Sequence, residues 1–378
     1  MSAAQPIPVL FTHYGEQWIR GSEQLLLDLM GQFDPAAVRP IVWTNGTEMA
    51  AAARTAGFPT YHTDFAYYLD AGSPAPNPFR YAGFVRQGLA LVRRHGVQVI
   101  HANSAAPVQW MLPVARLSGR RLLVHLHSSY LRRSRVVLGL RHVDLAVGVS
   151  NSVLAGLRAD GMAERRLRVI YNGIDIARLE RGGADDVALR SRLRLAPGEV
   201  LVVAVGSLIA RKGHDVLLRA LALLPPRGGR LAIAGDGPER AALERLAGEL
   251  GVAGQVDFLG YCADPGPVYR AADIVALASR GEALPLVLLE AGCLARPVVA
   301  TAVGGVAEAV ADGITGLLAP PDDPPALAAA LARLIADPAE RRRMGEAGRA
   351  RVAGGFSIAQ MTAGFLDAYR GLASPSGS

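Results

Sequence analysis

Short runs of apolar residues alternate with amphipathic stretches along nearly the whole chain. The apolar runs are almost continuous in Val, Leu and Ile, which is typical of strands buried on both faces of a parallel sheet. The pattern predicts helices between the runs, among them residues 23–30, 238–250 and 325–335. Strands that alternate with helices indicate an α/β protein with right-handed crossovers. The predicted strands are residues 8–12, 40–43, 97–101, 122–126, 144–149, 168–171, 200–205, 230–234, 256–259, 274–278 and 297–301.

The strands fall into two series, and 378 residues are about twice the usual size of one domain. We place the boundary between residues 176 and 198, where a charged stretch is interrupted by Gly182 and Gly183. We therefore expect two Rossmann-like, doubly wound parallel-sheet domains, residues 1–185 and 186–355. Residues 356–372 are predicted to form a helix that packs back on the first domain, and residues 373–378 a disordered tail. Since such sheets bind ligands at the carboxyl ends of their strands, we expect an active site in a cleft between the domains.

Composition favours a soluble protein of a reducing compartment. Half of the residues are apolar, 19% are charged, and the only cysteines are Cys262 and Cys293, too few for a disulfide framework. Residues 1–8 lack the pattern of a secretion signal. The most apolar stretch, residues 283–300, is broken by Glu290 and Arg296, so no run reaches the ~18 residues of a membrane span. We expect a cytoplasmic location.

The net charge of +7 lies in the first half of the chain. Residues 1–190 contain 21 Arg against 14 Asp and Glu, whereas the remaining residues contain 19 basic and 19 acidic side chains. A basic half indicates an anionic partner, such as a phospholipid surface, a polyprenyl diphosphate or nucleic acid. A bias toward arginine codons without functional meaning explains the asymmetry equally well.

The first candidate site is the segment from Gly206 to Gly213, a strand end followed by a loop and a helix. Arg211 and Lys212 would lie near the helix N-terminus, where backbone N–H groups and the helix dipole favour anions. Lys212 is the only lysine of the chain, so a compact ammonium has been kept where every other cation is Arg. We interpret the segment as a diphosphate site. The alternative is a solvated basic turn.

The second candidate site is a pair of carboxylates, Glu282 and Glu290, separated by seven residues. Pro285 suits the first position of a helix, which places Glu282 in a loop and Glu290 in the helix. Apolar neighbours make a buried Glu290 costly unless a partner is present, and two vicinal ribose hydroxyls would supply two donors. The alternative is a helix glutamate that reaches solvent.

In these residues the chain resembles the retaining glycosyltransferases of family 4 (glycosyl transferases group 1), which have the GT-B architecture. The resemblance covers nearly the whole length and is strongest over residues 199–320. It rests on the order and spacing of several motifs, which are residues 211–213 (Arg-Lys-Gly), the pair Glu282 and Glu290, residues 235–238 (Gly-Asp-Gly-Pro), 172–175 (Asn-Gly-Ile-Asp) and 312–316 (Asp-Gly-Ile-Thr-Gly).

The resemblance implies a role for each domain, with residues 1–185 on the acceptor side and residues 186–355 binding the nucleotide sugar. Lys212 and Arg211 would hold the donor diphosphate, Glu290 the ribose hydroxyls, and Glu282 the transferred sugar. Backbone N–H groups around Leu284, Pro285 and Leu286 would lie near the phosphate.

In the first domain, His127 matches a histidine that lines the reaction centre of the family. His125 lies two residues earlier, points to the same face of its strand, and is an alternative occupant. Gly21 resembles the last glycine of the family's Gly-Gly-x-Glu loop, where backbone approaches the donor phosphate. The chain departs from the family at Arg20, in place of the first glycine, and at Ser207, where many members have an arginine.

The implied reaction moves a sugar, with retention, from a UDP- or GDP-sugar to a glycan or polyprenyl-linked acceptor in polysaccharide or glycolipid synthesis. Preorganised cations can stabilise the leaving nucleoside diphosphate. The chain has no Asp-x-Asp motif, and His125 and His127 have no nearby Cys or His, so we expect catalysis without a metal or a cofactor. His127, Glu282 and Lys212 are the predicted catalytic residues.

Residues 130–141 interleave arginines with Leu and Val. As a helix, this stretch would suit peripheral contact with an anionic membrane surface, on the inner face of the membrane. The alternative is an ordinary core helix with an arginine edge.

Four other functions compete with a glycosyltransferase. A nucleotide-sugar epimerase of the same architecture needs acid and base groups on the sugar, which the two glutamates do not suggest. A NAD-dependent enzyme is weakly supported, since residues 235–238 lack the third glycine of Gly-x-Gly-x-x-Gly. A non-catalytic two-domain sugar-binding module would need a secretion signal. A nucleic-acid partner is disfavoured by 6% aromatic residues and scattered cations.

Overall fold

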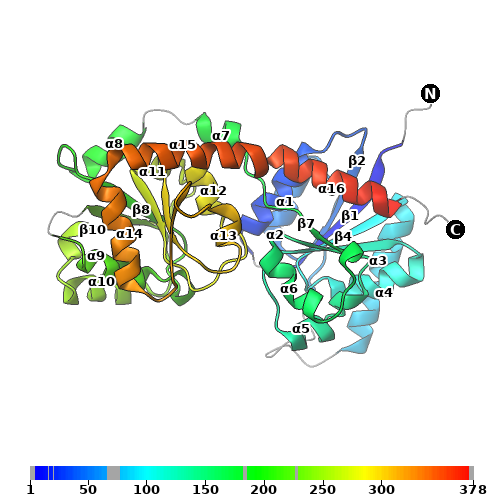
Figure 1. Cartoon of the computed structure of the whole chain (residues 1–378). Coiled ribbons are helices and arrows are strands. Elements are labelled where there is room, and N and C mark those ends of the chain that lie inside the picture. The colour runs from blue at the N-terminus through cyan, green and yellow to red at the C-terminus, as the bar shows by residue number, and fades with distance from the viewer. Residues whose placement is uncertain are drawn as a thin grey trace. The chain divides into compact units, whose positions relative to one another are not determined.

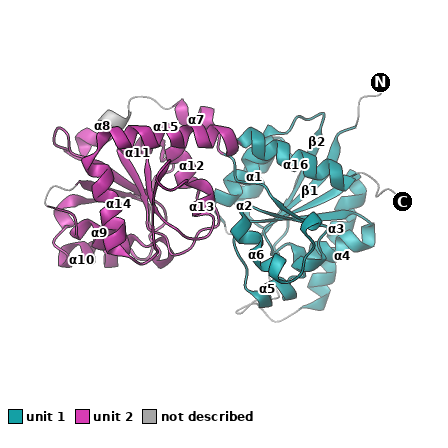
Figure 2. Ribbon diagram, in the orientation of Figure 1, with its two compact units in different colours: residues 1–173, 358–378 teal, residues 174–357 magenta. Residues whose placement is uncertain are grey.

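The computed structural model describes residues 5–15, 17–19, 21–65, 77–181, 185–225 and 229–373. The chain divides into two compact units (Figure 2). Unit 1 comprises residues 1–173 and 358–378, and unit 2 comprises residues 174–357. Arg20 and residues 374–378 of the expected tail lie outside the described residues.

Unit 1 contains a seven-stranded parallel sheet with the order β3-β2-β1-β4-β5-β6-β7 (Figure 1). Strands β1, β4 and β5 are buried after their first residue or throughout, and their mostly apolar sequences include the buried polar residues Thr12, His101 and His125. The strands are β1 (Ile7–His13), β2 (Val38–Thr44), β3 (Thr60–His62), β4 (Val99–Asn103), β5 (Arg121–Leu126), β6 (Leu145–Gly148) and β7 (Leu167–Val169).

Helices cover both faces of this sheet. On one face, Val9 and Phe11 of β1 pack in one apolar cluster with Leu29 and Phe365. On the other face, the ring of Trp43 packs against Phe65, which in turn contacts Phe84 of α3 and Trp110 of α4. The helices are α1 (Gly21–Gln32), α2 (Thr47–Thr55), α3 (Pro78–His95), α4 (Val108–Ser118), α5 (Arg132–Val137), α6 (Asn151–Ala159) and α16 (Ile358–Ala373), with short 3-10 turns η1 (Leu140–His142) and η2 (Glu164–Arg166).

The last helix, α16, belongs to unit 1 although unit 2 precedes it in sequence. It contacts α1, β1 and β4. Phe365 and Tyr369 are fully buried, and the Tyr369 hydroxyl lies 2.7 Å from Nδ1 of His101 on β4. This burial and one buried hydrogen bond hold the C-terminal helix against the sheet.

The chain passes from unit 1 to unit 2 after Gly173, earlier than the expected boundary at residues 176–198. The charged stretch belongs to unit 2 because its side chains bond there. Arg190 donates hydrogen bonds to the Ala271 carbonyl and to Asp273, which also accepts from the Leu201 amide. These contacts join the segment before β8 to the start of two central strands.

Unit 2 contains a six-stranded parallel sheet with the order β10-β9-β8-β11-β12-β13. All five strands expected in this half are present. The short β13 was not predicted, since its sequence Gly-Leu-Leu-Ala follows a turn motif. The strands are β8 (Leu201–Val205), β9 (Arg230–Ala234), β10 (Val256–Gly260), β11 (Ile274–Leu277), β12 (Val298–Thr301) and β13 (Gly316–Ala319).

Helices α9 and α14 pack together over one apolar cluster of the second sheet, which includes Val202, Leu217 and Leu331. Helices α12 and α15 pack against each other elsewhere in the unit. The helices are α7 (Ile176–Glu180), α8 (Asp185–Arg192), α9 (His214–Ala222), α10 (Arg240–Glu249), α11 (Gly266–Ala271), α12 (Leu286–Cys293), α13 (Val306–Ala309), α14 (Pro324–Ala336) and α15 (Pro338–Gly355), with 3-10 turns η3 (Ala210–Lys212) and η4 (Ala253–Gln255). None of the helices within the described ranges has the length and apolar character needed to span a bilayer.

Candidate functional site

Each sheet reverses its strand order at one point, and candidate residues of each unit lie near it. In unit 1 the reversal falls between β1 and β4, and in unit 2 between β8 and β11. Ligands of doubly wound sheets bind beyond the carboxyl ends of the strands at this switch point. The residues that follow β8 and β11 include Lys212 and Glu282, and those that end β1 and β4 are His13 and Asn103.

In unit 2, Glu282 is the centre of a buried cluster. Its Oε1 lies 2.6 Å from Nζ of Lys212 and accepts a hydrogen bond of 2.7 Å from the Ser279 hydroxyl. Only 8% of the Glu282 side chain and 15% of the Lys212 side chain are exposed. The two residues, which the family resemblance assigned to different parts of a substrate, therefore form one ion pair that fixes the direction of the ammonium.

Arg211 is directed toward the same loop. Its Nη1 donates to the Gly281 carbonyl at 2.7 Å and lies 3.5 Å from Oε2 of Glu282. Its guanidinium thus adds a second positive charge beside Lys212. Ser207, the departure from the family pattern, lies in the loop after β8, and Arg211 supplies a cation near that loop.

The loops are held by close backbone contacts that only glycine permits. Gly213 has φ of +64°, and a Cβ atom there would lie 2.0 Å from the Ala278 carbonyl oxygen. At Gly304, with φ of +53°, a Cβ atom would lie 1.7 Å from the Glu282 carbonyl oxygen. Gly213 thus allows the Lys212 turn to pack closely against the backbone that follows β11.

Arg280 braces the two loops from the solvent side. It donates to both carboxylate oxygens of Asp215, at 2.9 and 2.7 Å, and to Asp322 at 2.7 Å. The Arg280 backbone amide donates to the Arg211 carbonyl at 2.8 Å. The hydrogen bond with Asp215 is the main reason that the pKa of Arg280 is raised. These hydrogen bonds of Arg280 hold the turn that contains Lys212 next to the loop that contains Glu282.

Glu290 lies on α12, and its Oε2 accepts a 2.7 Å hydrogen bond from the hydroxyl of Tyr269, which is fully buried. Burial raises the pKa of Glu290, whereas the Tyr269 hydrogen bond and the charge of Arg178 lower it in part. Carboxylates whose pKa is shifted by burial and by specific neighbours are common in functional sites. The carboxylate retains Oε1 for a further donor.

The N-terminus of α12 lies between the two glutamates. Pro285 takes the N-cap position and Leu286 is the first helical residue, so the helix begins one residue later than predicted. The first amides of a helix have no intrahelical partner and favour an anion. Leu284 is buried and anchors this turn in the core.

In unit 1, the side chains of Glu23, His13, Asn103 and His127 contact one another in this order and form a chain of polar groups. His13 Nε2 lies 3.1 Å from Oε1 of Glu23, and His13 Nδ1 lies 3.0 Å from Nδ2 of Asn103. Asn103 Oδ1 lies 2.8 Å from Nε2 of His127. The next residue, Ser104, has φ of +83°, a left-handed conformation that is costly for a non-glycine residue and is frequent at functional sites.

Burial and neighbouring groups set the ionisation of Glu23 and His127 in this chain of polar groups. Although burial alone would raise the pKa of Glu23, its hydrogen bond with His13 holds the value at about 2. The pKa of His127 is lowered to about 4, mainly by burial and also by the neighbouring His13, against an opposing effect of Glu23. At neutral pH the Glu23 carboxylate is therefore ionised and the His127 ring is neutral.

His125, the alternative to His127, is a core residue. Only 2% of it is exposed, and its ring packs against Phe365 and His101 at centroid distances of 4.8 and 5.5 Å. Burial lowers its pKa well below the usual value. His127 is half-buried and bonded to Asn103, so it is the better candidate for contact with a substrate. Gly21 is exposed at the start of α1, whose residue Glu23 belongs to the same chain of polar groups.

The structure adds partners that sequence reasoning missed, namely Ser279 and Tyr269 in unit 2 and His13 and Asn103 in unit 1. His13 and Asn103 are the last residues of their strands, and Ser279 follows β11 closely. Polar residues at the carboxyl ends of central strands were the available signal. No sequence signal indicated Tyr269, since it lies on another helix and contacts Glu290 only because of the tertiary fold.

Two family models match the chain. Residues 19–178 match Glycosyltransferase Family 4, and residues 186–351 match Glycosyl transferases group 1. The two matches together cover most of both units.

Curated relatives match part or most of the chain. The D-inositol 3-phosphate glycosyltransferase of Nocardia farcinica is 41% identical over 225 residues, which are 55% of this chain and 48% of that protein. The GDP-mannose-dependent alpha-(1-6)-phosphatidylinositol monomannoside mannosyltransferase of Mycolicibacterium smegmatis is 34% identical over 281 residues, which are 68% of this chain and 72% of that protein. The chain spans about half the length of several curated relatives that it matches.

Solved structures share the fold. The crystal structure of Anabaena Alr3699/HepE in complex with UDP has a TM-score of 0.85 at 24% identity, covering 97% of this chain and all of that one. A glycosyltransferase from Rickettsia africae has a TM-score of 0.87 at 19% identity over 99% of this chain and all of that one. The two parallel sheets, the two family models and the 34% identity over most of the mycobacterial relative agree, and the chain belongs to family 4 of the glycosyltransferases (glycosyl transferases group 1), with the GT-B architecture.

Proposed function

We propose that the protein transfers a hexose, with retention of configuration, from a nucleoside-diphosphate sugar to a glycan or lipid-linked acceptor. The acceptor would belong to cell-surface polysaccharide or glycolipid synthesis. The observation that carries the proposal is the cluster of Lys212, Arg211 and Glu282 at the switch point of the second sheet. Support also comes from relatives named for GDP-mannose, inositol phosphate and lipopolysaccharide core.

Lys212 and Arg211 would bind the donor diphosphate. As the bond to the sugar breaks, negative charge grows on the leaving phosphate, and cations already fixed in place stabilise it without reorganisation. Glu282 holds the Lys212 ammonium at 2.6 Å. Its second carboxylate oxygen, 3.5 Å from Arg211, would accept from a hydroxyl of the transferred sugar. The first amides of α12, at Leu286, would add donors to the same phosphate.

Glu290 would accept hydrogen bonds from the two ribose hydroxyls. The Tyr269 hydroxyl fixes Oε2, and a buried carboxylate with a raised pKa gains most from new donors. This role explains why a carboxylate has been kept among apolar residues of α12.

In unit 1, the order of hydrogen bonds sets the tautomer of His127. His13 Nε2 lies 3.1 Å from Oε1 of Glu23, and with a neutral His13 ring its Nδ1 would accept from the Asn103 amide at 3.0 Å. The Asn103 carbonyl oxygen accepts from Nε2–H of His127, so Nδ1 of His127 carries the lone pair. We propose that this ring contacts a substrate hydroxyl, with Asn103 as its positioning residue.

Substituting Asn103 tests this arrangement. We expect Asn103→Leu, which removes both hydrogen bonds, to lower kcat by about 10- to 100-fold, because small losses of orientation are costly in catalysis. Asn103→Asp keeps an acceptor for His127 and adds a negative charge, which raises the pKa of His127. Since neutral His127 is the proposed working form, the acid limb of the kcat profile should move to higher pH in Asn103→Asp. An unchanged profile, or wild-type kcat in Asn103→Leu, would rule the positioning role out.

The acceptor side includes an exposed apolar and basic edge around α5. Leu131 and Val136 are 81% and 58% exposed, and the Arg132 side chain is 85% exposed. Arg135 instead pairs with Asp160 at 2.6 Å, and Leu138 and Leu140 are buried, so only part of the predicted amphipathic stretch faces outward. We propose that this edge meets an anionic membrane surface when the acceptor is lipid-linked.

A donor and acceptor panel tests the whole proposal. Nucleoside diphosphate release should occur with one UDP- or GDP-hexose, should continue in EDTA, and should yield a product with the anomeric configuration of the donor. A polyprenyl-linked acceptor in anionic vesicles should be used faster than the same glycan free in solution. Release with none of the donors would contradict the function. Activity abolished by EDTA and restored by Mg²⁺ would contradict metal independence, and equal use of both acceptors would contradict the membrane contact.

A further inference from the structure

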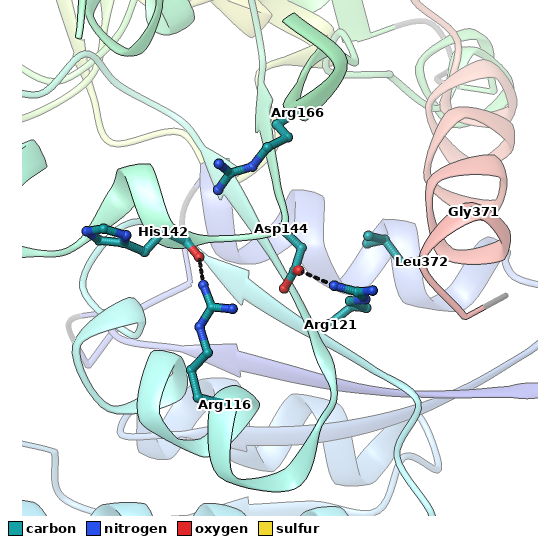
Figure 3. A pocket seen from close by; sticks show the side chains of 7 residues that line it. All are labelled: Arg116, Arg121, His142, Asp144, Arg166, Gly371 and Leu372. Carbon is teal, nitrogen blue, oxygen red and sulfur yellow. Dashed lines mark hydrogen bonds and ion pairs between the residues drawn. The ribbon is translucent and has the colours of Figure 1, made fainter. Parts of the chain in front are cut away.

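Unit 1 contains a basic hollow at the edge of the sheet where strands begin. It has a volume of about 410 Å³ and is lined by Arg116, Arg121, His142, Asp144, Arg166, Gly371 and Leu372. Figure 3 shows the three guanidinium groups around the segment that joins His142 to Asp144, with the end of α16 beside them. The lining comes from four separate parts of unit 1, so the fold alone brings these arginines together.

Local hydrogen bonds hold the arginines in place. Arg116 donates from Nη2 to the His142 carbonyl at 2.7 Å, and Arg166 donates from Nη2 to the Arg141 carbonyl at 2.8 Å and also to the Val143 carbonyl. Within the described parts of the chain, Arg116 and Arg166 have no carboxylate partner. Their charges are therefore fixed in direction but not neutralised.

The hollow carries an excess of positive charge. Asp144 is the one carboxylate of its lining, and it pairs with Arg121 at 2.9 Å and accepts from the Leu122 amide at 2.9 Å. Three arginines against one aspartate leave a formal charge of +2 when His142 is counted as neutral. A phosphate monoester carries a charge of about −1.5 to −2 at neutral pH and accepts hydrogen bonds from guanidinium forks.

This hollow is separate from the proposed reaction centre of unit 1. Arg121 is the first residue of β5, and His127 directly follows the last residue, Leu126. At about 3.3 Å per residue, six residues of strand separate the two by about 20 Å. A group bound at Arg121 thus lies at the opposite edge of the sheet from His127 and has no part in bond breaking.

We propose that this hollow binds the phosphate group of an anionic ligand, which is either a free phosphorylated molecule or a phospholipid headgroup. Arg116 and Arg166 provide the uncompensated charges, and Arg121, held by Asp144, provides directed donors. Part of the excess positive charge of the first half of the chain is thus gathered in this one hollow.

Arginine footprinting tests the site residue by residue, which separates it from phosphate binding at Lys212 and Arg211. The full chain is treated with p-hydroxyphenylglyoxal with and without millimolar inorganic phosphate, and modified peptides are quantified by mass spectrometry. Phosphate should slow modification of Arg116 and Arg166 several-fold. The exposed neighbours Arg120 and Arg165, which do not line the hollow, should react at unchanged rates. If phosphate changed the modification rates of all four arginines equally, or of none, the proposal would be overturned.

A matched pair of variants and a lipid arm complete the test. Arg116→Gln with Arg166→Gln should abolish phosphate protection of Arg121, whereas Arg120→Gln with Arg165→Gln, an equal loss of charge, should retain it. Phosphatidylcholine vesicles with and without phosphatidic acid distinguish the sources. Protection by phosphatidic acid vesicles beyond that by phosphate assigns a lipid headgroup, and protection by phosphate alone assigns a free ligand. Absence of protection in both arms refutes the site, whatever the fold stability of the variants.

Discussion

Replacing Lys212 with glutamine is expected to lower the rate of nucleoside diphosphate release by about 10²- to 10³-fold, the usual cost of removing one preorganised charge from a transition state. Lys212 is the only lysine of the chain, and its Nζ lies 2.6 Å from Glu282 at the switch point of the second sheet. The loss should appear mainly in kcat, since the charge on the leaving phosphate grows as the bond breaks. Single-turnover kinetics with the preferred donor measure it.

In this variant, a loss of folding stability must be distinguished from a loss of catalytic activity. Lys212→Gln leaves Glu282, 8% exposed, with Ser279 and Arg211 as its remaining partners. Breaking a buried pair costs about 3–5 kcal/mol when a charge is left alone, and Arg211 should keep the cost below that range. Adding Glu282→Gln removes the stranded charge, so thermal stability should recover in the double variant while activity stays low.

A charge-matched control lies on the next helix. Arg219 is exposed on α9, and Arg219→Gln should change neither activity nor stability by a measurable amount. If activity returned together with stability in the double variant, Lys212 would be a structural residue, and the donor site would have to be sought elsewhere.

The strands were predictable because a buried parallel strand is apolar on both faces. Eleven predicted strands are present, most of them within one or two residues of the observed bounds. The two strands that were missed, β3 and β13, lie at sheet edges and are three and four residues long. Gly316 opens β13 because a Cβ atom there would lie 2.4 Å from the Val298 carbonyl oxygen, so a residue typical of turns stands in a strand.

The division of the chain was less predictable, because charge does not distinguish a linker from a bonded segment. Ile174 forms a parallel bridge with Ser357, and its amide donates to the Phe356 carbonyl at 2.9 Å. These contacts connect residues far apart in sequence, which no local pattern reveals. The arginines of the stretch that follows are tied to carbonyl groups and aspartates of unit 2.

The candidate site shows the same contrast between residue type and pairing. Sequence patterns indicated Lys212 as the only lysine of the chain, Glu290 as a carboxylate among apolar residues, and Glu282 by its spacing from Glu290. That Lys212 pairs with Glu282, and Glu290 with Tyr269, depends on the meeting of separate loops and helices. Candidate site residues can thus be selected in sequence by rarity or by an unfavourable local environment, whereas the residues that contact them are ordinary in sequence and are found only from the fold.

Replacing Glu290 with glutamine is expected to lower kcat/KM for the donor by about 10²-fold or more and to raise thermal stability at the same time. Each hydrogen bond to a charged acceptor contributes about 1.5–3 kcal/mol, and the variant weakens two proposed bonds to ribose. Glutamine still accepts from Tyr269, so the contact seen in the free protein is kept. What the substitution removes is a carboxylate whose ionised form is disfavoured by burial.

The pH dependence of this gain follows from the direction of the shift. The folded-state pKa of Glu290 is raised, so the ionised form costs stability at pH values above it, and the cost disappears below the ordinary pKa of a glutamate. The stability difference between Glu290→Gln and wild type should therefore vanish in acid, grow as pH rises from the ordinary pKa to the raised pKa, and stay constant above it. Glu346→Gln, at an exposed position on α15, provides the control and should leave both stability and kcat/KM unchanged. A residue whose loss stabilises the fold but impairs donor use is retained for function. Wild-type kcat/KM in Glu290→Gln would show that this carboxylate does not bind the donor.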